Sequence, residues 1–431
     1  MEDDVLFKEL FNKIEELPVV DCHEHILGPK REVTKREPLA SLIEGYVQSD
    51  LLSAGITQKE LDILNDNEIE TEKKWGIFEK FWKKIEFTAY AKVTKLIMRD
   101  IYGEEEISLQ SILRIKDKII LPTEENYDSL LGQAHIEVIL SDALSDFQTL
   151  KNFIDGELDY YNKIRFLFPL PQFHHDVRSF DFVQSVGALL NRHITSLEDY
   201  LEVVYELLEK AKERGIVGIK DQSAYTRSLD YELVPRYEAE RSFNEILSDP
   251  RNSLGWPEAK PLDDFLFHQF MNFAGELKLP VQIHTGHMAG IRNRIEKTNA
   301  VFLTNVLELY QDLKFDLFHG NWPYIGEILF LAKNYPNVYI DLCWVNIIDP
   351  IYSEELYSRA ILTTPHTKIN GFGGDYPDVP EYIVSHLKIC RENITRALVR
   401  LIRMGWIDEN SALEIARDWL FNNPKELFNL S

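Results

Sequence analysis

Eight short apolar runs, separated by stretches with helical periodicity, constrain the fold of this chain more than any other feature. Each run ends in polar residues, as buried strands do. The runs cover residues 18–26, 136–141, 164–170, 216–220, 280–284, 315–319, 338–342 and 368–372. Strands that alternate with helices build parallel sheets, so eight of them favour an α/β fold, a closed (β/α)8 TIM barrel. The alternative is an open doubly wound sheet, but no glycine-rich turn follows the first run.

The first two runs lie about a hundred residues apart, far more than one crossover helix requires. The segment between them is helical in pattern, and residues 72–87 carry a wide apolar stripe. We therefore expect one barrel over residues 1–431, with residues 28–126 as a helical insertion over its mouth. The alternative is an independent helical domain that interrupts the barrel.

The charge balance excludes some classes of partner. The 431 residues include 47 basic and 71 acidic side chains, a net charge of −24. Such a chain repels phosphate backbones and anionic membranes, so we expect no nucleic-acid or membrane partner. Three cysteines are too few for a disulfide framework, and the first residues lack the apolar core of a signal peptide. These features predict a cytoplasmic location.

The first strand carries the clearest candidate for a metal site. Alternate residues of a strand face the same side, so Asp21, His23 and His25 are all expected to point into the barrel. The two histidines would lie at the carboxyl end of the strand, where barrel active sites are built. Two neighbouring imidazoles can bind one divalent cation such as zinc, and Asp21 could orient an imidazole from beneath.

Three other strands end in residues that bind metals. The fifth ends at His284, the sixth at His319, and the eighth leads through glycines to Asp375. In a barrel all four strand ends meet at one rim, so these residues predict a metal centre. Lys220 ends the fourth strand. His174 and His175 follow the third strand and could line the pocket, but we do not expect them to be ligands.

The pattern resembles the amidohydrolase superfamily, in particular its amidohydrolase-2 type of metal-dependent TIM-barrel hydrolase. The likeness is strongest over residues 215–321 and includes the strand ends at His23, His25 and Asp375. Other segments are similar to the amidohydrolase domain of nodulin/glutamine-synthetase-like fusion proteins. They are residues 220–227, 280–286, 335–339 and 365–375. Residues 419–428 resemble the closing helix and loop of amidohydrolase-2 proteins.

The resemblance implies roles for these residues. His23, His25, His284 and Asp375 would be metal ligands. His319 would bind a second metal, or hydrogen-bond the substrate or the hydrolytic water. In two-metal members a lysine at the position of Lys220 is carbamylated and bridges both ions. The alternatives are an ion pair with Asp221 or contact with an anionic substrate.

These residues predict hydrolysis of an amide, lactone or related bond through a metal-activated water, with Asp375 as the proton carrier. Substrate contacts are expected from loops after the fourth and fifth strands. The candidates are Tyr225, Arg227, Arg292 and Arg294. Arginines match carboxylates, so a small, carboxylate-bearing substrate is expected. The arginines could instead pair with the protein's own carboxylates.

Two other functions remain open. A similar barrel can carry uronate isomerase-like or decarboxylase activity, or serve as a catalytically silent scaffold for assembly. The expected cofactor is a divalent metal, with zinc as the favoured ion, bound as one or two ions. The expected partner is a small-molecule substrate, and self-association into a homo-oligomer is possible.

Overall fold

The eight predicted strands form one parallel sheet whose neighbours follow the order of the sequence. The computed structural model describes residues 2–30, 32–377 and 379–430. The strands are β1 (Val19–Glu24), β2 (Ile136–Ser141), β3 (Ile164–Pro169), β4 (Gly218–Asp221), β5 (Val281–Ile283), β6 (Phe315–Leu317), β7 (Val338–Asp341) and β8 (Ile369–Asn370). The prediction of a (β/α)8 barrel is confirmed, although most strands are shorter than the apolar runs.

Backbone hydrogen bonds between β1 and the segment after β8 join the two ends of the sheet. The N–H of Cys22 donates to the carbonyl of Phe372 at 2.9 Å, and that of Asp375 donates to the carbonyl of His23 at 2.8 Å. Glycines allow this approach. A Cβ atom at Gly373 would lie 3.0 Å from the backbone nitrogen of His23, and one at Gly374 would lie 2.0 Å from the carboxylate of Glu24. The glycine run thus brings Asp375 against β1.

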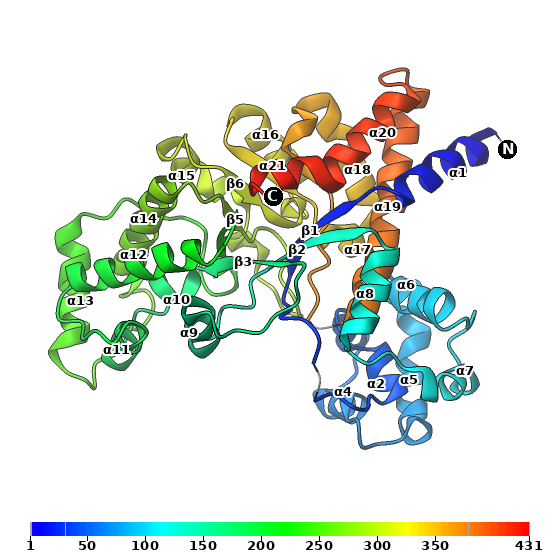
Figure 1. Cartoon of the computed structure of the whole chain (residues 1–431), viewed down its shortest axis with the longest axis horizontal. Helices are drawn as coiled ribbons and strands as arrows, with labels where there is room; N and C mark the ends of the chain where they lie inside the picture. Colours follow the sequence, from blue (N-terminus) through cyan, green and yellow to red (C-terminus); the bar gives the residue numbers. More distant parts are fainter. Residues whose placement is uncertain (1, 31, 378, 431) are drawn as a thin grey trace.

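Helices surround the barrel (Figure 1). They are α1 (Glu2–Glu15), α8 (Glu124–Gln133), α9 (Phe147–Asp155), α10 (Pro171–His174), α11 (Phe180–Ala188), α12 (Leu197–Glu213), α13 (Arg236–Ser248), α14 (Lys260–Leu277), α15 (Thr304–Leu309), α16 (Ile325–Asn334), α17 (Val345–Ile348), α18 (Pro350–Thr363), α19 (Pro380–Arg403), α20 (Glu409–Arg417) and α21 (Asn423–Leu427). Their amphipathic faces cover the outside of the sheet. In α12, for example, the buried residues Leu201, Val204 and Leu208 follow helical spacing.

Between β1 and β2 the chain forms a separate group of helices, drawn in blue and cyan in Figure 1. They are α2 (Pro38–Leu42), α3 (Val47–Ser53), α4 (Gln58–Asn65), α5 (Thr71–Ile85), α6 (Ala89–Leu96) and α7 (Leu109–Arg114). A buried ion pair joins Lys74 of α5 to Glu37 at 2.8 Å. Arg36 connects the group to the barrel through Glu381 of α19, at 2.6 Å.

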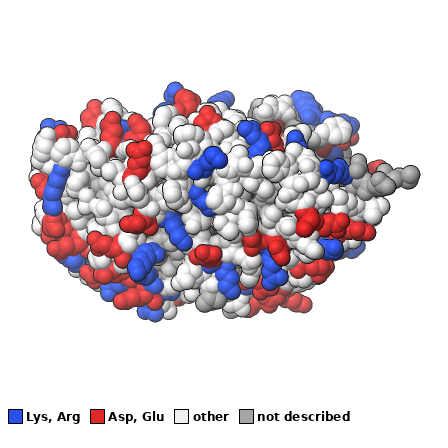
Figure 2. All heavy atoms as spheres, turned by 90° about the horizontal axis from the view of Figure 1, so that it is seen from above, with Lys and Arg blue, Asp and Glu red and all other residues white. Residues whose placement is uncertain are grey.

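The surface carries the acidic excess of the composition. On the face shown in Figure 2, carboxylates gather along the periphery, and lysine and arginine side chains lie among them singly or in small groups. Among the residues that the structure describes, no helix has both the length and the apolar character needed to cross a bilayer.

Candidate metal centre

His23 and His25 lie at the carboxyl end of β1 and share one oxygen of Asp375. The Nε2 atom of His23 lies 3.2 Å from Oδ1 of Asp375, and that of His25 lies 2.9 Å from the same oxygen. Ligand atoms bonded to one cation at about 2.1 Å lie about 3.0 to 3.4 Å apart. The three side chains therefore already have the spacing of ligands around a divalent cation.

Asp142, directly after β2, orients His25. Its carboxylate accepts a hydrogen bond from Nδ1 of His25 at 2.6 Å. Burial opposes its charge, but Asp142 and Asp375 raise the pKa of His25 to about 10, so each ring nitrogen donates to a carboxylate. A cation would take the place of the proton on Nε2. Asp142 was not predicted, although a polar residue at a strand end is the signal that identified the other candidates.

Asp21 has a different role from the one expected. Its carboxylate lies beneath the centre but accepts hydrogen bonds from the backbone N–H groups of His23, at 3.2 Å, and Gly374, at 3.1 Å. Burial raises the pKa of Asp21 to about 7. Asp21 therefore connects β1 to the loop after β8 and does not orient an imidazole.

His284 and His319 form a second pair of imidazoles. Nε2 of His319 lies 3.3 Å from Nδ1 of His284 and 3.9 Å from Oδ2 of Asp375. Nε2 of His284 donates to the backbone carbonyl of His287 at 2.8 Å. This bond places a proton on Nε2 of His284, so Nδ1, which accepts from Nε2 of His319, would be the nitrogen available to a cation.

The carboxylate of Asp375 thus lies between two pairs of histidines. Burial opposes its charge, but His23 and His25 hold the pKa of Asp375 well below its ordinary value, so it is ionised. Its backbone is left-handed, with φ of 63°. Non-glycine residues held in this region are uncommon and gather at functional sites.

Lys220 is buried at the end of β4 and faces this centre. Its Nζ has no hydrogen-bond partner among the described residues and lies 3.2 Å from the centroid of the Phe318 ring. Burial lowers the pKa of Lys220. The expected alternative of an ion pair with Asp221 is not seen, since that carboxylate binds Ser223 and Tyr231.

Aromatic residues from the helical group and from the loop after β7 form a wall beside the centre. Tyr46, at the start of α3, donates a hydrogen bond to the backbone carbonyl of Asp375. The ring of Tyr46 stacks on Trp344 with centroids 4.3 Å apart, and Trp344 meets the edge of His319 at 5.4 Å. The helices between β1 and β2 thereby reach the carboxyl ends of the barrel strands.

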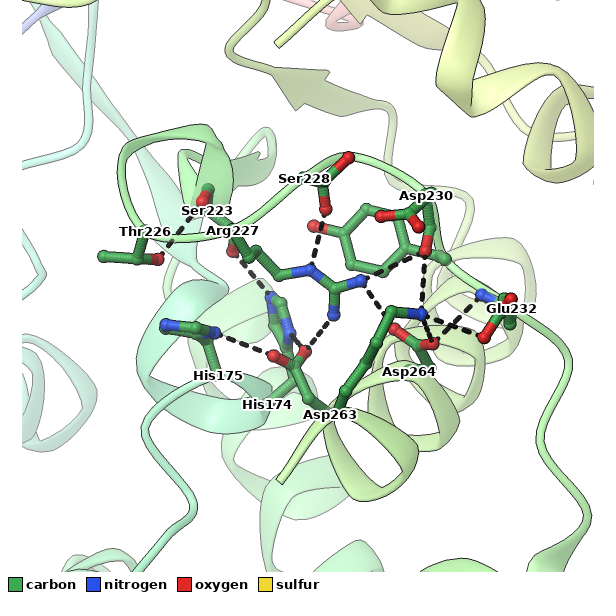
Figure 3. Close-up of polar contacts among 12 residues, drawn as sticks. His174, His175, Ser223, Thr226, Arg227, Ser228, Asp230, Glu232, Asp263 and Asp264 are labelled. Atoms are coloured by element: carbon green, nitrogen blue, oxygen red, sulfur yellow. Dashed lines mark hydrogen bonds and ion pairs between the residues drawn. The ribbon is translucent and has the colours of Figure 1, made fainter. Parts of the chain in front are cut away.

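The four residues predicted to bind substrate lie in different places. Tyr225 adjoins the centre, with its ring 4.8 Å from that of His284. Arg292 and Arg294 are exposed, and Arg294 pairs with Glu296 at 2.8 Å. Arg227 is buried and directed away from the expected pocket, toward Asp263 at 2.8 Å and Asp264 at 2.6 Å (Figure 3). Both aspartates belong to α14 and form ion pairs with the guanidinium of Arg227. This pairing differs from the substrate contact expected for Arg227 from the sequence.

Asp263 is the centre of a second polar cluster, behind β4 (Figure 3). Its two oxygens accept hydrogen bonds from Nδ1 of His174 at 2.6 Å and Nδ1 of His175 at 2.7 Å. Nε2 of His174 faces Ser223 at 3.1 Å and Asp221 at 3.6 Å. The cluster supports β4, and the carbonyl of Asp221 accepts the backbone N–H of His284.

This cluster predicts a dependence of stability on pH. Burial opposes the charge, but Asp263 and Asp221 raise the pKa of His174 from 6.5 to about 9. Arg227, His175 and Tyr231 also face this cluster. A pKa raised on folding stabilises the protein fully below pH 6.5, and the stabilisation is lost as the pH rises through about 9. The full effect is on the order of 3 kcal/mol.

Urea unfolding of the wild type and of His174→Gln, measured between about pH 6.5 and 9, tests this prediction. The variant should be less stable at the lower pH, and the difference should shrink as the pH rises. A difference that stays constant over this range would contradict the assignment of the charge to His174.

Comparisons with known proteins identify the family of this chain. The sequence model of the family described as amidohydrolase matches residues 190–429. Protein fluG of Emericella nidulans is 26% identical over 61% of this chain, but the match spans only 30% of fluG itself. The uronate isomerase of Thermotoga neapolitana is 23% identical over 97% of this chain and 96% of its own length.

Solved structures show the same fold. The crystal structure of uronate isomerase from Thermotoga maritima superposes with a TM-score of 0.78 and 17% identity, covering 98% of this chain and 97% of the isomerase. A putative metal-dependent hydrolase from Lactobacillus casei superposes with a TM-score of 0.64 and 17% identity, covering 97% of each chain. With the family model matching more than half of the sequence, this chain belongs to the amidohydrolase family.

Proposed function

We propose that this protein is a metal-dependent hydrolase that cleaves an amide, lactone or related bond in a small polar substrate. The observation that carries the proposal is the ionised carboxylate of Asp375 between the two pairs of histidines. His23 and His25 would hold a cation at Oδ1, and His284 and His319 would hold one near Oδ2. Imidazole nitrogens suit zinc. When bound, zinc acts as a Lewis acid that polarises a carbonyl oxygen and makes water acidic.

The residues of the chain supply the proton transfers. Asp375 is ionised, so it can accept the proton of the attacking water and return it to the leaving group. Asp142 holds the ring of His25 through Nδ1, so Nε2 would be the nitrogen offered to a cation, and the carbonyl of His287 would leave Nδ1 of His284 for the same role. Of the arginines expected to bind a substrate carboxylate, Arg227 and Arg294 are occupied by the protein's own carboxylates, which leaves Arg292.

Isotopic oxygen from water tests hydrolysis. Amide and lactone libraries of small acids are incubated with the purified protein in ¹⁸O-labelled water, and the products are analysed by mass spectrometry. A hydrolytic product gains one labelled oxygen. If turnover is found only for compounds whose mass does not change, the hydrolase proposal fails.

Isomerisation of a uronate is the second candidate, and the comparisons favour it. The likeness to uronate isomerases extends over the whole chain, including the helices between β1 and β2. An aldose–ketose isomerisation leaves the mass of the substrate unchanged, and it exchanges a carbon-bound hydrogen with solvent. Incubation of uronates in heavy water, followed by NMR, distinguishes this reaction from hydrolysis.

Lys220 is proposed to bridge two cations as a carbamate. An unpaired ammonium group is costly to bury, whereas a neutral amine reacts with carbon dioxide. The two histidine pairs would then hold one cation each. We expect metal analysis of protein purified without chelators to find two ions per chain, falling to one or none in Lys220→Ala. One ion in both proteins would instead assign Lys220 to the substrate or to the structure.

A further inference from the structure

Cys343 lies directly beyond β7, at the same rim as the histidines, and is fully buried. Ligand atoms of Cys343, His319 and Asp375 all lie within 4.8 Å of one another. We propose that Cys343 is a thiolate ligand of the metal centre, on the side of Asp375 that faces His319. The assignment goes one step beyond the proposed function and rests on its metal centre.

All three residues of this group have a left-handed backbone. Cys343 has φ of 39°, His319 has φ of 58° and Asp375 has φ of 63°. Each non-glycine residue in such a conformation costs on the order of 1 kcal/mol or more. Glycine adopts a left-handed backbone without this cost. A cysteine that is held in it therefore indicates a role beyond filling space. The donor atoms of these three residues converge.

The loop after β8 leaves space for the sulfur of Cys343. A Cβ atom at Gly373 would lie 2.8 Å from Sγ of Cys343, closer than two such atoms can approach. The glycine therefore keeps the loop after β8 open at the side where the sulfur lies. Any other residue at this position would push the thiol away from Asp375.

A thiolate would change which metal the centre selects. Soft sulfur ligands favour zinc over manganese and magnesium, whereas carboxylates and imidazoles alone discriminate less. On binding, the sulfur–metal bond forms and the thiol proton is released to solvent. A bond of about 2.3 Å to sulfur and about 2.1 Å to nitrogen places the two atoms about 3.6 Å apart, which modest side-chain rotation can reach from this arrangement.

Cys390 provides a matched control within the same chain. It is also fully buried, but it lies on α19, with its thiol 3.4 Å from the carbonyl of Gly371 and 3.6 Å from the hydroxyl of Tyr357. A neutral thiol among such groups is typical of packing. Replacement of Cys390 by serine tests the general effect of losing a buried thiol near the barrel.

Cobalt reports the ligand directly, because it replaces zinc in the same sites and, unlike zinc, absorbs light. The full-length protein is stripped with a chelator and reloaded with Co²⁺. Visible ligand-field bands show that the ion is bound, and a near-ultraviolet charge-transfer band shows a thiolate bond. We expect both in the wild type and in Cys390→Ser. In Cys343→Ser we expect only the ligand-field bands, with zinc affinity reduced at least about tenfold more than manganese affinity.

The outcomes separate this inference from the proposed function. Ligand-field bands without a charge-transfer band in the wild type would overturn the thiolate ligand but keep the metal centre. So would a charge-transfer band that persists in Cys343→Ser. If no cobalt binds to the wild type, both proposals fail. If Cys343→Ser does not fold, Cys343→Ala replaces it, and a charge-transfer band that persists in Cys343→Ala would overturn the assignment.

Discussion

Replacement of Asp375 by asparagine is expected to reduce kcat/KM by at least about a thousandfold. The carboxylate is shared by His23 and His25 and faces His319, so the variant loses both a ligand charge and the proton acceptor. General acid–base catalysis alone contributes about a hundred- to ten-thousandfold. Asparagine has nearly the same shape, so the fold should be kept. Turnover is measured with a substrate found by the ¹⁸O experiment. The metal content is measured on the same preparation.

Asp142→Asn is the matched comparison for this prediction. Asp142 hydrogen-bonds Nδ1 of His25, whereas the other ring nitrogen, Nε2, faces Asp375. Loss of such a partner typically costs about ten- to a hundredfold in metal affinity or activity. The loss should therefore be clearly smaller than in Asp375→Asn. An Asp375→Asn protein that keeps its metal and its full turnover would exclude Asp375 as the proton carrier.

Replacement of Asp263 by asparagine is expected to destabilise the protein by about 3 to 5 kcal/mol. Asp263 is buried, accepts hydrogen bonds from His174 and His175, and forms an ion pair with Arg227 (Figure 3). Asparagine removes the negative charge and leaves buried cations without full compensation, which costs more than the loss of an exposed ion pair. The free energy of unfolding is measured by urea denaturation near neutral pH.

An exposed ion pair gives the control for this variant. Lys151 and Asp155 lie 2.9 Å apart on α9, with both side chains about a third or more exposed. Solvent screens this pair, so Asp155→Asn should cost less than about 1 kcal/mol. Equal losses in the two variants would show that Asp263 contributes no more than a surface carboxylate. The double variant Asp263→Asn/His174→Gln should be more stable than the sum of the two single losses predicts, since one cation of the cluster is absent.

The helical group between β1 and β2 shows one limit of the sequence. Its length and its amphipathic helices could be expected from the spacing of the first two apolar runs and from the stripe in residues 72–87. The hydrogen bond from Tyr46 to the carbonyl of Asp375 could not. Residues 329 positions apart meet here, and no local pattern specifies which tyrosine of the group reaches the centre.

The charged residues show a second limit. Arg227 follows a strand end, as a substrate-binding arginine would, and its sequence context does not distinguish the two roles. The structure decides the matter because α14 presents Asp263 and Asp264 on the side facing the guanidinium. A buried arginine pairs with the carboxylates that the fold places against it. In a chain with 71 acidic residues, the sequence cannot say which these are.

The sequence by itself determined the barrel and most of the predicted rim. Hydrophobic runs fix strands locally, and parallel strands must bring their carboxyl ends together, so His23, His284, His319 and Asp375 could be assigned to one place. Only the tertiary structure revealed Asp142 and Cys343 beside them. Each is one polar residue among many at strand ends, and its role depends on how far the loop turns inward. At Cys343 the loop turns inward with a left-handed backbone, and Gly373 leaves room beside the thiol, which only the folded chain shows.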